Sequence, residues 1–209
     1  MNQTKLINQR LQELIVLDQS SDIRDTLKRH WKINEKKTLL WQIKLKTAKK
    51  VYRLVKQKKP KIILELGTSA GYSALVMLKA KPNALIHTIE CVPYRIQMAK
   101  DSFSKTKTQK SVIIYEDKIK KILDEWIKKK KFQKSKIDFV LIDADKEFYE
   151  ENTKKILPML SKKAIIVTDN ILDNPNKTKK YIKFMKSLKN FKTKVYKIDN
   201  GVLVAKRIN

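Results

Sequence analysis

One short stretch, residues 61–72, constrains the fold more than any other part of the chain. It reads Lys-Ile-Ile-Leu-Glu-Leu-Gly-Thr-Ser-Ala-Gly-Tyr and holds two of the three glycines, Gly67 and Gly71. Its apolar start is typical of a strand buried on both faces, and a helical pattern follows. A buried strand, a glycine turn and a helix form the corner at which open α/β sheets bind nucleotides. The spacing matches neither a dinucleotide fingerprint nor a P-loop, so a turn without a ligand is the alternative.

The composition is that of a single globular domain. The chain has 209 residues, of which 42% are hydrophobic, and this is enough for one α/β domain with a full core. No apolar run approaches the roughly 20 residues that a membrane helix needs, and residues 1–10 carry no signal-peptide core. The single Cys91 excludes an internal disulfide framework and a cysteine-rich zinc site. We expect a soluble, cytoplasmic protein without a membrane partner.

The chain is strongly basic, with a formal net charge of +28. Such a charge favours a nucleic-acid partner. Six of the 49 basic residues are arginine and the others are lysine, although arginine is the usual residue for bidentate phosphate and base contacts. Lys, Ile and Asn share A/T-rich codons, so genome composition is the alternative source of the charge.

Apolar runs and helical patterns alternate along most of the chain. The expected strands are residues 62–66, 84–89, 111–115, 137–142, 164–167, 193–198 and 202–205. Helical patterns separate the first five, and Asp199-Asn200-Gly201 joins the last two as a hairpin. This order predicts an α/β fold with a doubly wound, Rossmann-like sheet that is mostly parallel and ends in an antiparallel C-terminal hairpin.

The N-terminal part is expected to be helical. Asp22 is a candidate cap for a short second helix that reaches Trp31. We treat residues 1–34 as a helical segment that either packs on the sheet or serves as a substrate lid or dimer arm. Residues 35–209 follow without a linker as one domain, which begins with an amphipathic helix over residues 35–58.

Every expected parallel strand ends at a carboxylate. These acids and their neighbour are Glu65, Glu90, Glu116 with Asp117, Asp143 with Asp145, and Asp169 beside Asn170. Ligands of such sheets bind beyond the carboxyl ends of the strands. Repulsion among so many acids is unfavourable without a cation or hydrogen-bond donors. Since the protein has only 21 acidic residues, their gathering at one edge indicates a binding site.

Two of these acids suit a nucleoside. Glu90 ends the second strand, where an acid commonly binds the ribose hydroxyls of a bound cofactor; the alternative is a helix N-cap. Asp117 follows the third strand and is placed to accept the amino group of an adenine. Its alternative is an N-cap for a helix over residues 119–127.

Asp143, Asp169 and Asn170 form a second constellation. They follow the fourth and fifth strands, which we expect to be neighbours. Hard oxygen ligands, with positions left open for water and substrate, suit Mg²⁺ better than zinc. Lys146 lies three positions after Asp143 and is a candidate base. The alternative is an ordinary solvated lysine.

Four motifs in this order resemble the cation-dependent O-methyltransferase family, which uses S-adenosylmethionine (SAM). They are Glu-Leu-Gly-Thr-Ser-Ala-Gly-Tyr-Ser (65–73), Thr-Ile-Glu (88–90), Ile-Asp-Ala-Asp-Lys (142–146) and Val-Thr-Asp-Asn (167–170). The family includes catechol and caffeoyl-CoA O-methyltransferases and bacterial enzymes that methylate 5-hydroxyuridine in tRNA. Two segments depart from its pattern: Glu116-Asp117-Lys118 and Lys162-Lys163 stand where the family has glycine-containing motifs.

The resemblance implies a role for each candidate residue. The implied cofactor-binding residues are Glu65, Gly67, Ser73, Glu90, Asp117 and Asp143. The implied metal ligands are Asp143, Asp169 and Asn170. Lys146 would be the catalytic base, with Asp143 beside it in the catalytic set. The implied reaction is in-line transfer of the SAM methyl group to a hydroxyl that Mg²⁺ activates.

The acceptor stays open between two classes. The basic charge favours tRNA, and a catechol-like small molecule is the alternative, with Trp31 and Trp41 as either pocket walls or core residues. A non-catalytic nucleic-acid-binding protein on a methyltransferase scaffold is the competing function. An NAD-dependent oxidoreductase is disfavoured because its Gly-x-Gly fingerprint is missing. Dimerisation within the family makes a homodimer the expected assembly.

Overall fold

The computed structural model describes residues 2–19, 40–133 and 136–208. The helices are α1 (Gln3–Gln19), α3 (Leu45–Lys58), α4 (Tyr72–Ala80), α5 (Pro93–Lys105), α6 (Ile119–Lys128), α7 (Tyr149–Ile156) and α8 (Pro175–Ser187). The strands are β1 (Ile62–Leu66), β2 (Leu85–Glu90), β3 (Val112–Glu116), β4 (Ile137–Ile142), β5 (Leu160–Thr168), β6 (Phe191–Tyr196) and β7 (Val202–Arg207). Short 3-10 turns occupy Gln109–Ser111, Lys146–Phe148 and Leu157–Met159.

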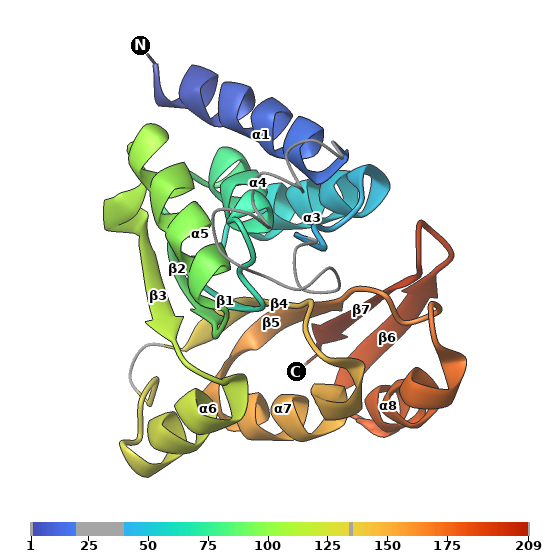
Figure 1. Cartoon of the computed structure of the whole chain (residues 1–209). Coiled ribbons are helices and arrows are strands. Elements are labelled where there is room, and N and C mark those ends of the chain that lie inside the picture. Colours follow the sequence, from blue (N-terminus) through green and yellow to red (C-terminus); the bar gives the residue numbers. More distant parts are fainter. Residues whose placement is uncertain (1, 20–39, 134–135, 209) are drawn as a thin grey trace.

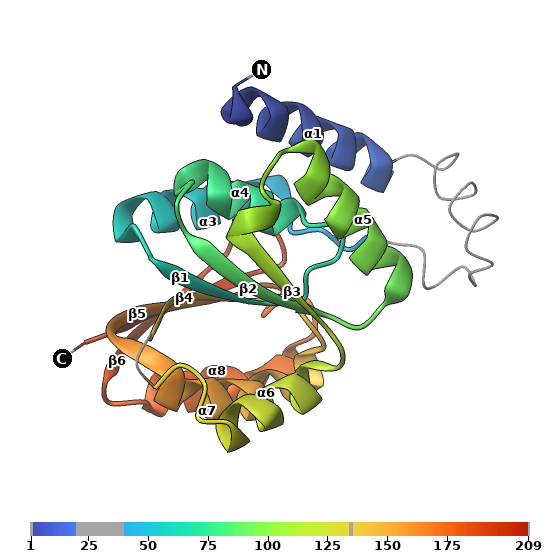
Figure 2. The same ribbon diagram turned by 90° about the vertical axis from the view of Figure 1, so that its left-hand side faces the viewer.

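One sheet lies between two layers of helices (Figure 1). Figure 2 shows α1, α3, α4 and α5 on one face, with α6, α7 and α8 on the other. The strand order is β3-β2-β1-β4-β5-β7-β6. β1 to β5 pair in parallel, and β7 pairs antiparallel with both β5 and β6. The order reverses direction between β1 and β4, and ligands of open α/β sheets bind at that switch point.

The central strands are buried on both faces, as their continuous apolar runs predict. In β1, Ile63 belongs to the core under α3 and α4, whereas Leu64 belongs to the core on the α7 side. Phe139 and Val140 of β4 divide in the same way. All four side chains are fully buried. The two cores fix the sheet from both sides, so the ends of its strands form a rigid platform.

The predicted fold is confirmed, but one predicted helix begins later than expected. The pattern predicts a helix over residues 35–58, and α3 begins at Leu45. Leu40 and Ile43 are buried, and their spacing imitates a helix although the backbone there is not helical. Trp41 between them has a φ of 48°. The cap predicted at Asp22 and the helix through Trp31 lie outside the described residues.

α1 packs on α4 and α5. Ile7, Leu11 and Leu14 are buried. Arg10 is buried too, and its guanidinium donates to Ser102 Oγ at 3.1 Å and to Asp101 Oδ2 at 2.9 Å. These contacts join the N-terminal helix to α5. In the part of the chain that the structure describes, no helix is long and apolar enough to cross a membrane.

Candidate cofactor and metal site

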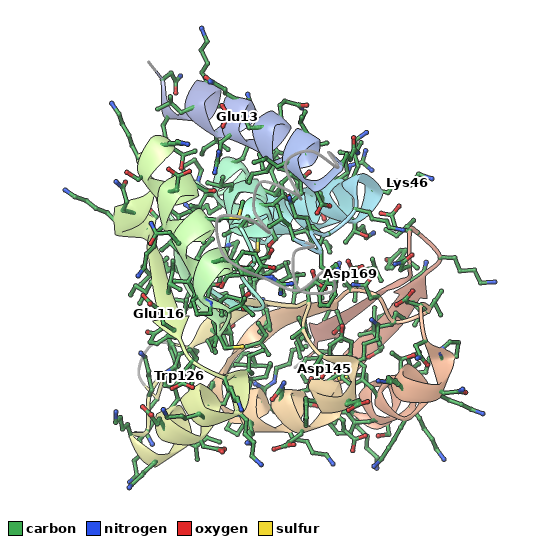
Figure 3. All side chains as sticks on the ribbon, viewed as in Figure 1. Glu13, Lys46, Glu116, Trp126, Asp145 and Asp169 are labelled. Atoms are coloured by element: carbon green, nitrogen blue, oxygen red, sulfur yellow. The ribbon has the colours of Figure 1, made fainter. Side chains whose placement is uncertain are left out.

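The predicted cofactor turn and the predicted metal ligands lie where β1, β4 and β5 end. Backbone hydrogen bonds continue beyond the strands: the Asp143 amide donates to the Leu66 carbonyl at 2.9 Å, and the Asp169 amide donates to the Ile142 carbonyl at 3.0 Å. Figure 3 shows Asp169 at this edge of the sheet and Asp145 beside the start of α7. The sheet therefore places the residues after these three strands side by side.

Gly67 is required by a close approach of two loops. Its φ is +100°, and a Cβ built there would lie 2.1 Å from the Asp143 carbonyl oxygen. Gly71 has a φ of +85° and is the N-cap of α4. Glycine alone takes both conformations without strain. The turn after β1 is thus packed directly against the loop that carries Asp143.

Glu65 is fully buried below this turn. It accepts hydrogen bonds from the hydroxyls of Ser73 and Thr88, each at 2.6 Å. Burial raises the pKa of Glu65 to about 7, and the charge of Glu90 adds to the rise. Ser73 therefore holds Glu65 in this structure, and the predicted contact of either residue with a cofactor stays a prediction.

Glu90 is buried and organises the loops around the end of β2. Its Oε2 accepts from the backbone amide of Ser69 at 3.0 Å, and its Oε1 accepts from the amides of Cys91 at 2.9 Å and Val92 at 3.0 Å. Val92 is the N-cap of α5, so Glu90 supports the entry to this helix rather than capping it. Oε1 thus accepts two hydrogen bonds, whereas Oε2 accepts one and keeps a lone pair for a ligand.

The side chain of Asp117 contacts residues that are close to it in the sequence. It accepts from the backbone amide of Lys118 at 2.7 Å and pairs with Lys121. The hydrogen bond from Lys121 lowers the pKa of Asp117. Lys118, not Asp117, is the N-cap of α6. Among the described residues, the structure gives Asp117 no hydrogen bond to the other predicted site residues, and its adenine contact stays a prediction.

Asp143, Asp169 and Asn170 come together as predicted from their strand positions. Asn170 Nδ2 donates to Asp143 Oδ1 at 3.0 Å. Burial and the neighbouring charge of Asp169 raise the pKa of Asp143 to about 8. Burial also raises the pKa of Asp169 to about 6. Asn170 has a φ of 57°, which asparagine tolerates better than most residues.

These donors suit a hard divalent cation. Two buried carboxylates with raised pKa values have little charge compensation of their own, and a cation there would favour their ionised forms. The described residues contain no group of three His, Cys, Asp or Glu side chains arranged as a metal site; the predicted set has two carboxylates and an amide. The oxygen chemistry of this set matches Mg²⁺. Metal binding itself stays a prediction.

Lys146 lies at the rim of this cluster. Its Nζ pairs with Asp173 Oδ2 at 3.1 Å, and its side chain is 23% exposed. Its positive charge lowers the pKa values of both Asp143 and Asp169, against the larger effect of burial. Lys146 is therefore near both carboxylates, but its ion-pair partner is an acid that we did not predict.

Thr47, Asp199 and Asn200 complete the site and were not predicted. Thr47 Oγ1 donates to Asp199 Oδ2 at 3.0 Å and lies 3.4 Å from Asp169 Oδ1. Asn200 Nδ2 donates to Asn170 Oδ1 at 3.1 Å. The sequence Asp199-Asn200-Gly201 was interpreted only as a hairpin turn. The one signal for a wider role is that this turn places two further polar side chains directly before β7, the antiparallel strand next to β5.

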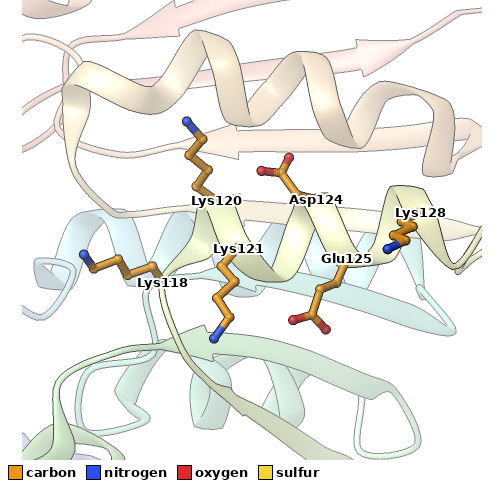
Figure 4. Close-up of a pocket in the computed structure, with 6 residues that line it drawn as sticks. All are labelled: Lys118, Lys120, Lys121, Asp124, Glu125 and Lys128. Atoms are coloured by element: carbon orange, nitrogen blue, oxygen red, sulfur yellow. The ribbon is translucent and has the colours of Figure 1, made fainter.

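The surface hollows do not add a second candidate site. One hollow on α6 is lined by Lys118, Lys120, Lys121, Asp124, Glu125 and Lys128. Figure 4 shows these side chains pointing away from the helix in different directions rather than converging. Another hollow, between α7 and α8, includes Lys146.

Trp41 is 62% exposed, so this predicted pocket wall is not a core residue, and the Arg95 guanidinium lies 5.0 Å from its ring.

Comparisons with known proteins find a family model and several proteins that this chain resembles. A family model described as O-methyltransferase matches residues 17–206. A catechol O-methyltransferase of Niastella koreensis is 33% identical over 113 residues, which are 54% of this chain and 50% of that protein. A catechol O-methyltransferase of Sus scrofa is 28% identical over 122 residues, which are 57% of this chain and 64% of that protein. The matches thus span about half to under two thirds of the relatives' own length.

A solved structure shows the same fold. The O-methyltransferase TomG from Streptomyces achromogenes, in complex with SAM, has a TM-score of 0.74 at 16% identity, with 100% of each chain covered.

Proposed function

This chain belongs to the O-methyltransferase family, and we propose that it transfers a methyl group from SAM to a hydroxyl in a Mg²⁺-dependent reaction. The contact between the turn of Gly67 and the loop of Asp143 carries the proposal. It puts the predicted cofactor turn against the predicted metal ligands at the switch point of the sheet. A reaction that needs cofactor and cation within a few ångströms fits this arrangement.

Each group of residues in the site would have a separate role in the proposed reaction. Glu90, held by three backbone amides, would accept the ribose hydroxyls of SAM. Mg²⁺ held by Asp143, Asp169 and Asn170 would make the acceptor hydroxyl more acidic and fix its orientation. Lys146 would take the hydroxyl proton. SAM would supply the methyl group: its carbon–sulfur bond would break as the bond to the acceptor oxygen forms, which would give the methyl ether and S-adenosylhomocysteine.

For the acceptor we propose an RNA hydroxyl, with 5-hydroxyuridine of tRNA as the first candidate. The net charge of +28 supports a polyanionic acceptor. A catechol-like small molecule is the second candidate, because the two curated relatives described above are catechol O-methyltransferases. The exposed ring of Trp41, with the Arg95 guanidinium 5.0 Å from its centroid, suits a flat acceptor of either kind.

Calorimetric titration of SAM tests the proposal. SAM is expected to bind the wild-type protein, and Glu90→Ala is expected to weaken binding at least ten-fold, since the ribose contact is lost. Glu90→Gln keeps one oxygen for the backbone amides and separates loop disorder from the ribose contact. If SAM fails to bind with or without Mg²⁺ while RNA binds, the protein is a nucleic-acid-binding scaffold and the proposed enzyme is wrong.

A further inference from the structure

Three neighbouring elements carry basic residues and no acidic ones. α3, β6 and β7 together hold ten lysines and arginines and no Asp or Glu. In or next to α5, α6 and α7, lysines pair with acids one turn away, as in Lys105–Asp101, Lys121–Asp117, Lys129–Glu125 and Lys154–Glu150. α8 also carries lysines without an acid of its own, but it lies on the other face of the sheet. The positive charge of α3, β6 and β7 is therefore not balanced by acids within these three elements.

Two of these lysines face each other across the hairpin. Lys192 of β6 is the direct cross-strand partner of Lys206 of β7, and both side chains are exposed. Lys194 lies on the same face as Lys192 because strand residues two apart share a face. Like charges directly opposite in a sheet are destabilising. An anion bound between them would remove that repulsion.

α3 extends this face toward the site. The Lys50 ammonium lies 3.8 Å from the centroid of the Tyr196 ring, and the Lys194 ammonium lies 5.1 Å from it. Lys46 and Arg53 are exposed on the same helix, and Figure 3 shows Lys46 pointing away from α3 into solvent. None of these side chains has an ion pair with an acid among the described residues.

The same elements touch the candidate site at one end. The backbone amide of Thr47 donates to Asp199 Oδ2 at 2.7 Å, and Lys44 Nζ donates to Asn200 Oδ1 at 3.1 Å. Asn200 in turn contacts Asn170. The charged surface therefore runs along β6 and α3 and ends beside the predicted metal ligands.

We propose that the basic face, defined as Lys46, Lys50, Arg53, Lys192, Lys194 and Lys206, binds the phosphate backbone of an RNA acceptor and leads it to the site. A six-residue strand spans roughly 20 Å, which gives a linear track for several nucleotides. Lysines contact phosphates as point charges and do not distinguish between bases. Recognition of the modified base would therefore depend on residues of the candidate site. The inference rests on the proposed function for the acceptor class.

The test compares two charge-matched triple variants. Lys192→Gln, Lys194→Gln and Lys206→Gln change the basic face, whereas Lys179→Gln, Lys183→Gln and Lys186→Gln change exposed lysines of α8 on the other side of the sheet. Binding of a fluorescein-labelled tRNA transcript is followed by anisotropy across a salt series, without SAM or metal. The basic-face variant is expected to bind at least ten-fold more weakly, with a salt slope smaller by about 2. The α8 variant is expected to bind within about two-fold of the wild type.

Equal losses in the two variants would overturn the proposal, since the binding would then follow net charge alone. The proposal would also be overturned if the wild type bound anionic lipid vesicles but not RNA, and the basic-face variant lost the binding to vesicles. Both variants should keep SAM binding by calorimetry, and the basic-face variant should melt no lower than the wild type because a like-charge pair is gone. If the wild type fails to bind RNA, only the inference about the basic face is wrong. If the wild type fails to bind SAM, only the methyltransferase proposal is wrong.

Discussion

Asn170 donates its side-chain amide to Asp143 at 3.0 Å and so joins the ends of β5 and β4. The amide oxygen of Asn170 meanwhile accepts from Asn200 at 3.1 Å and faces away from Asp143. A cation beside Asp143 needs that oxygen instead, which requires the amide to rotate. The hydrogen bond from Asn200 thereby favours the arrangement in which the amide nitrogen of Asn170 faces Asp143.

Replacement of Asn200 is expected to strengthen Mg²⁺ binding. In Asn200→Asp, a carboxylate would accept from Asn170 Nδ2 and turn its oxygen toward Asp143, so we expect a several-fold lower Kd by calorimetry. Asn200→Leu removes the donor without adding a charge and should strengthen binding by a smaller factor. Weaker binding in Asn200→Leu would show that Asn200 supports the metal-bound arrangement, contrary to this prediction.

Mg²⁺ affinity should rise with pH. The pKa values of Asp169 and Asp143 are raised, to about 6 and about 8, so protons occupy both carboxylates at low pH and compete with the cation. Binding between pH 5 and 8 is expected to release protons, which calorimetry detects as a heat that depends on the ionisation enthalpy of the buffer. Asp143→Asn should flatten the dependence; a pH-independent affinity in the wild type would contradict the prediction.

The metal-free protein should lose stability over the same range. An acid whose pKa is higher in the folded than in the unfolded state binds more protons when folded, so stability falls as the pH rises through the window between the two values. We expect the melting temperature to drop from pH 5 to pH 8 and Mg²⁺ to restore it. Asp143→Asn should show a smaller drop, and an equal drop would assign the effect to other groups.

Gly67→Ala should destabilise the protein by straining the turn between β1 and α4. The new Cβ would lie 2.1 Å from a backbone oxygen at a φ of +100°, and the combined strain is about 3 kcal/mol. That corresponds to a loss of roughly 6–12 °C in melting temperature. Gly201→Ala is the matched control, because its φ of +86° carries the same backbone strain while its Cβ would meet the side chain of Leu172 rather than a backbone oxygen. A loss in Gly67→Ala no greater than in Gly201→Ala would refute the close packing of the two loops.

Lys146→Met should separate chemistry from binding. If Lys146 takes the hydroxyl proton, methyl transfer is expected to fall at least about 100-fold, while the Kd for SAM changes little. Asp173→Asn, which removes the ion-pair partner at 3.1 Å, is expected to keep most of the activity. Full activity in Lys146→Met, measured as S-adenosylhomocysteine release, would exclude the lysine as the base.

The sequence predicted the sheet and the positions of the site acids well, for a physical reason. Strands buried on both faces are mostly apolar, so the first polar residue after the run of β4, Asp143, marks where that strand ends. β4 has the predicted bounds, residues 137–142. Parallel pairing then brings Asp143 beside Gly67 and Asp169, which are far apart in the chain.

The remaining parts depend on contacts that local patterns do not contain. Leu40 and Ile43 have helical spacing but are held by core packing outside the helix. Asp199 and Asn200 fit a hairpin turn, and only the pairing of β7 with β5 takes them to Asn170. The partner of Lys146, Asp173, lies beyond β5 and could not be paired with it from spacing alone.

The most direct test of the proposed function is methyl transfer from radiolabelled SAM to a tRNA containing 5-hydroxyuridine, with a catechol as the parallel acceptor. The assay compares Mg²⁺ with EDTA, and wild type with Asp169→Ala. We predict transfer to the tRNA that EDTA abolishes and that Asp169→Ala lacks. Transfer to either acceptor that survives both EDTA and Asp169→Ala would contradict the metal-dependent mechanism.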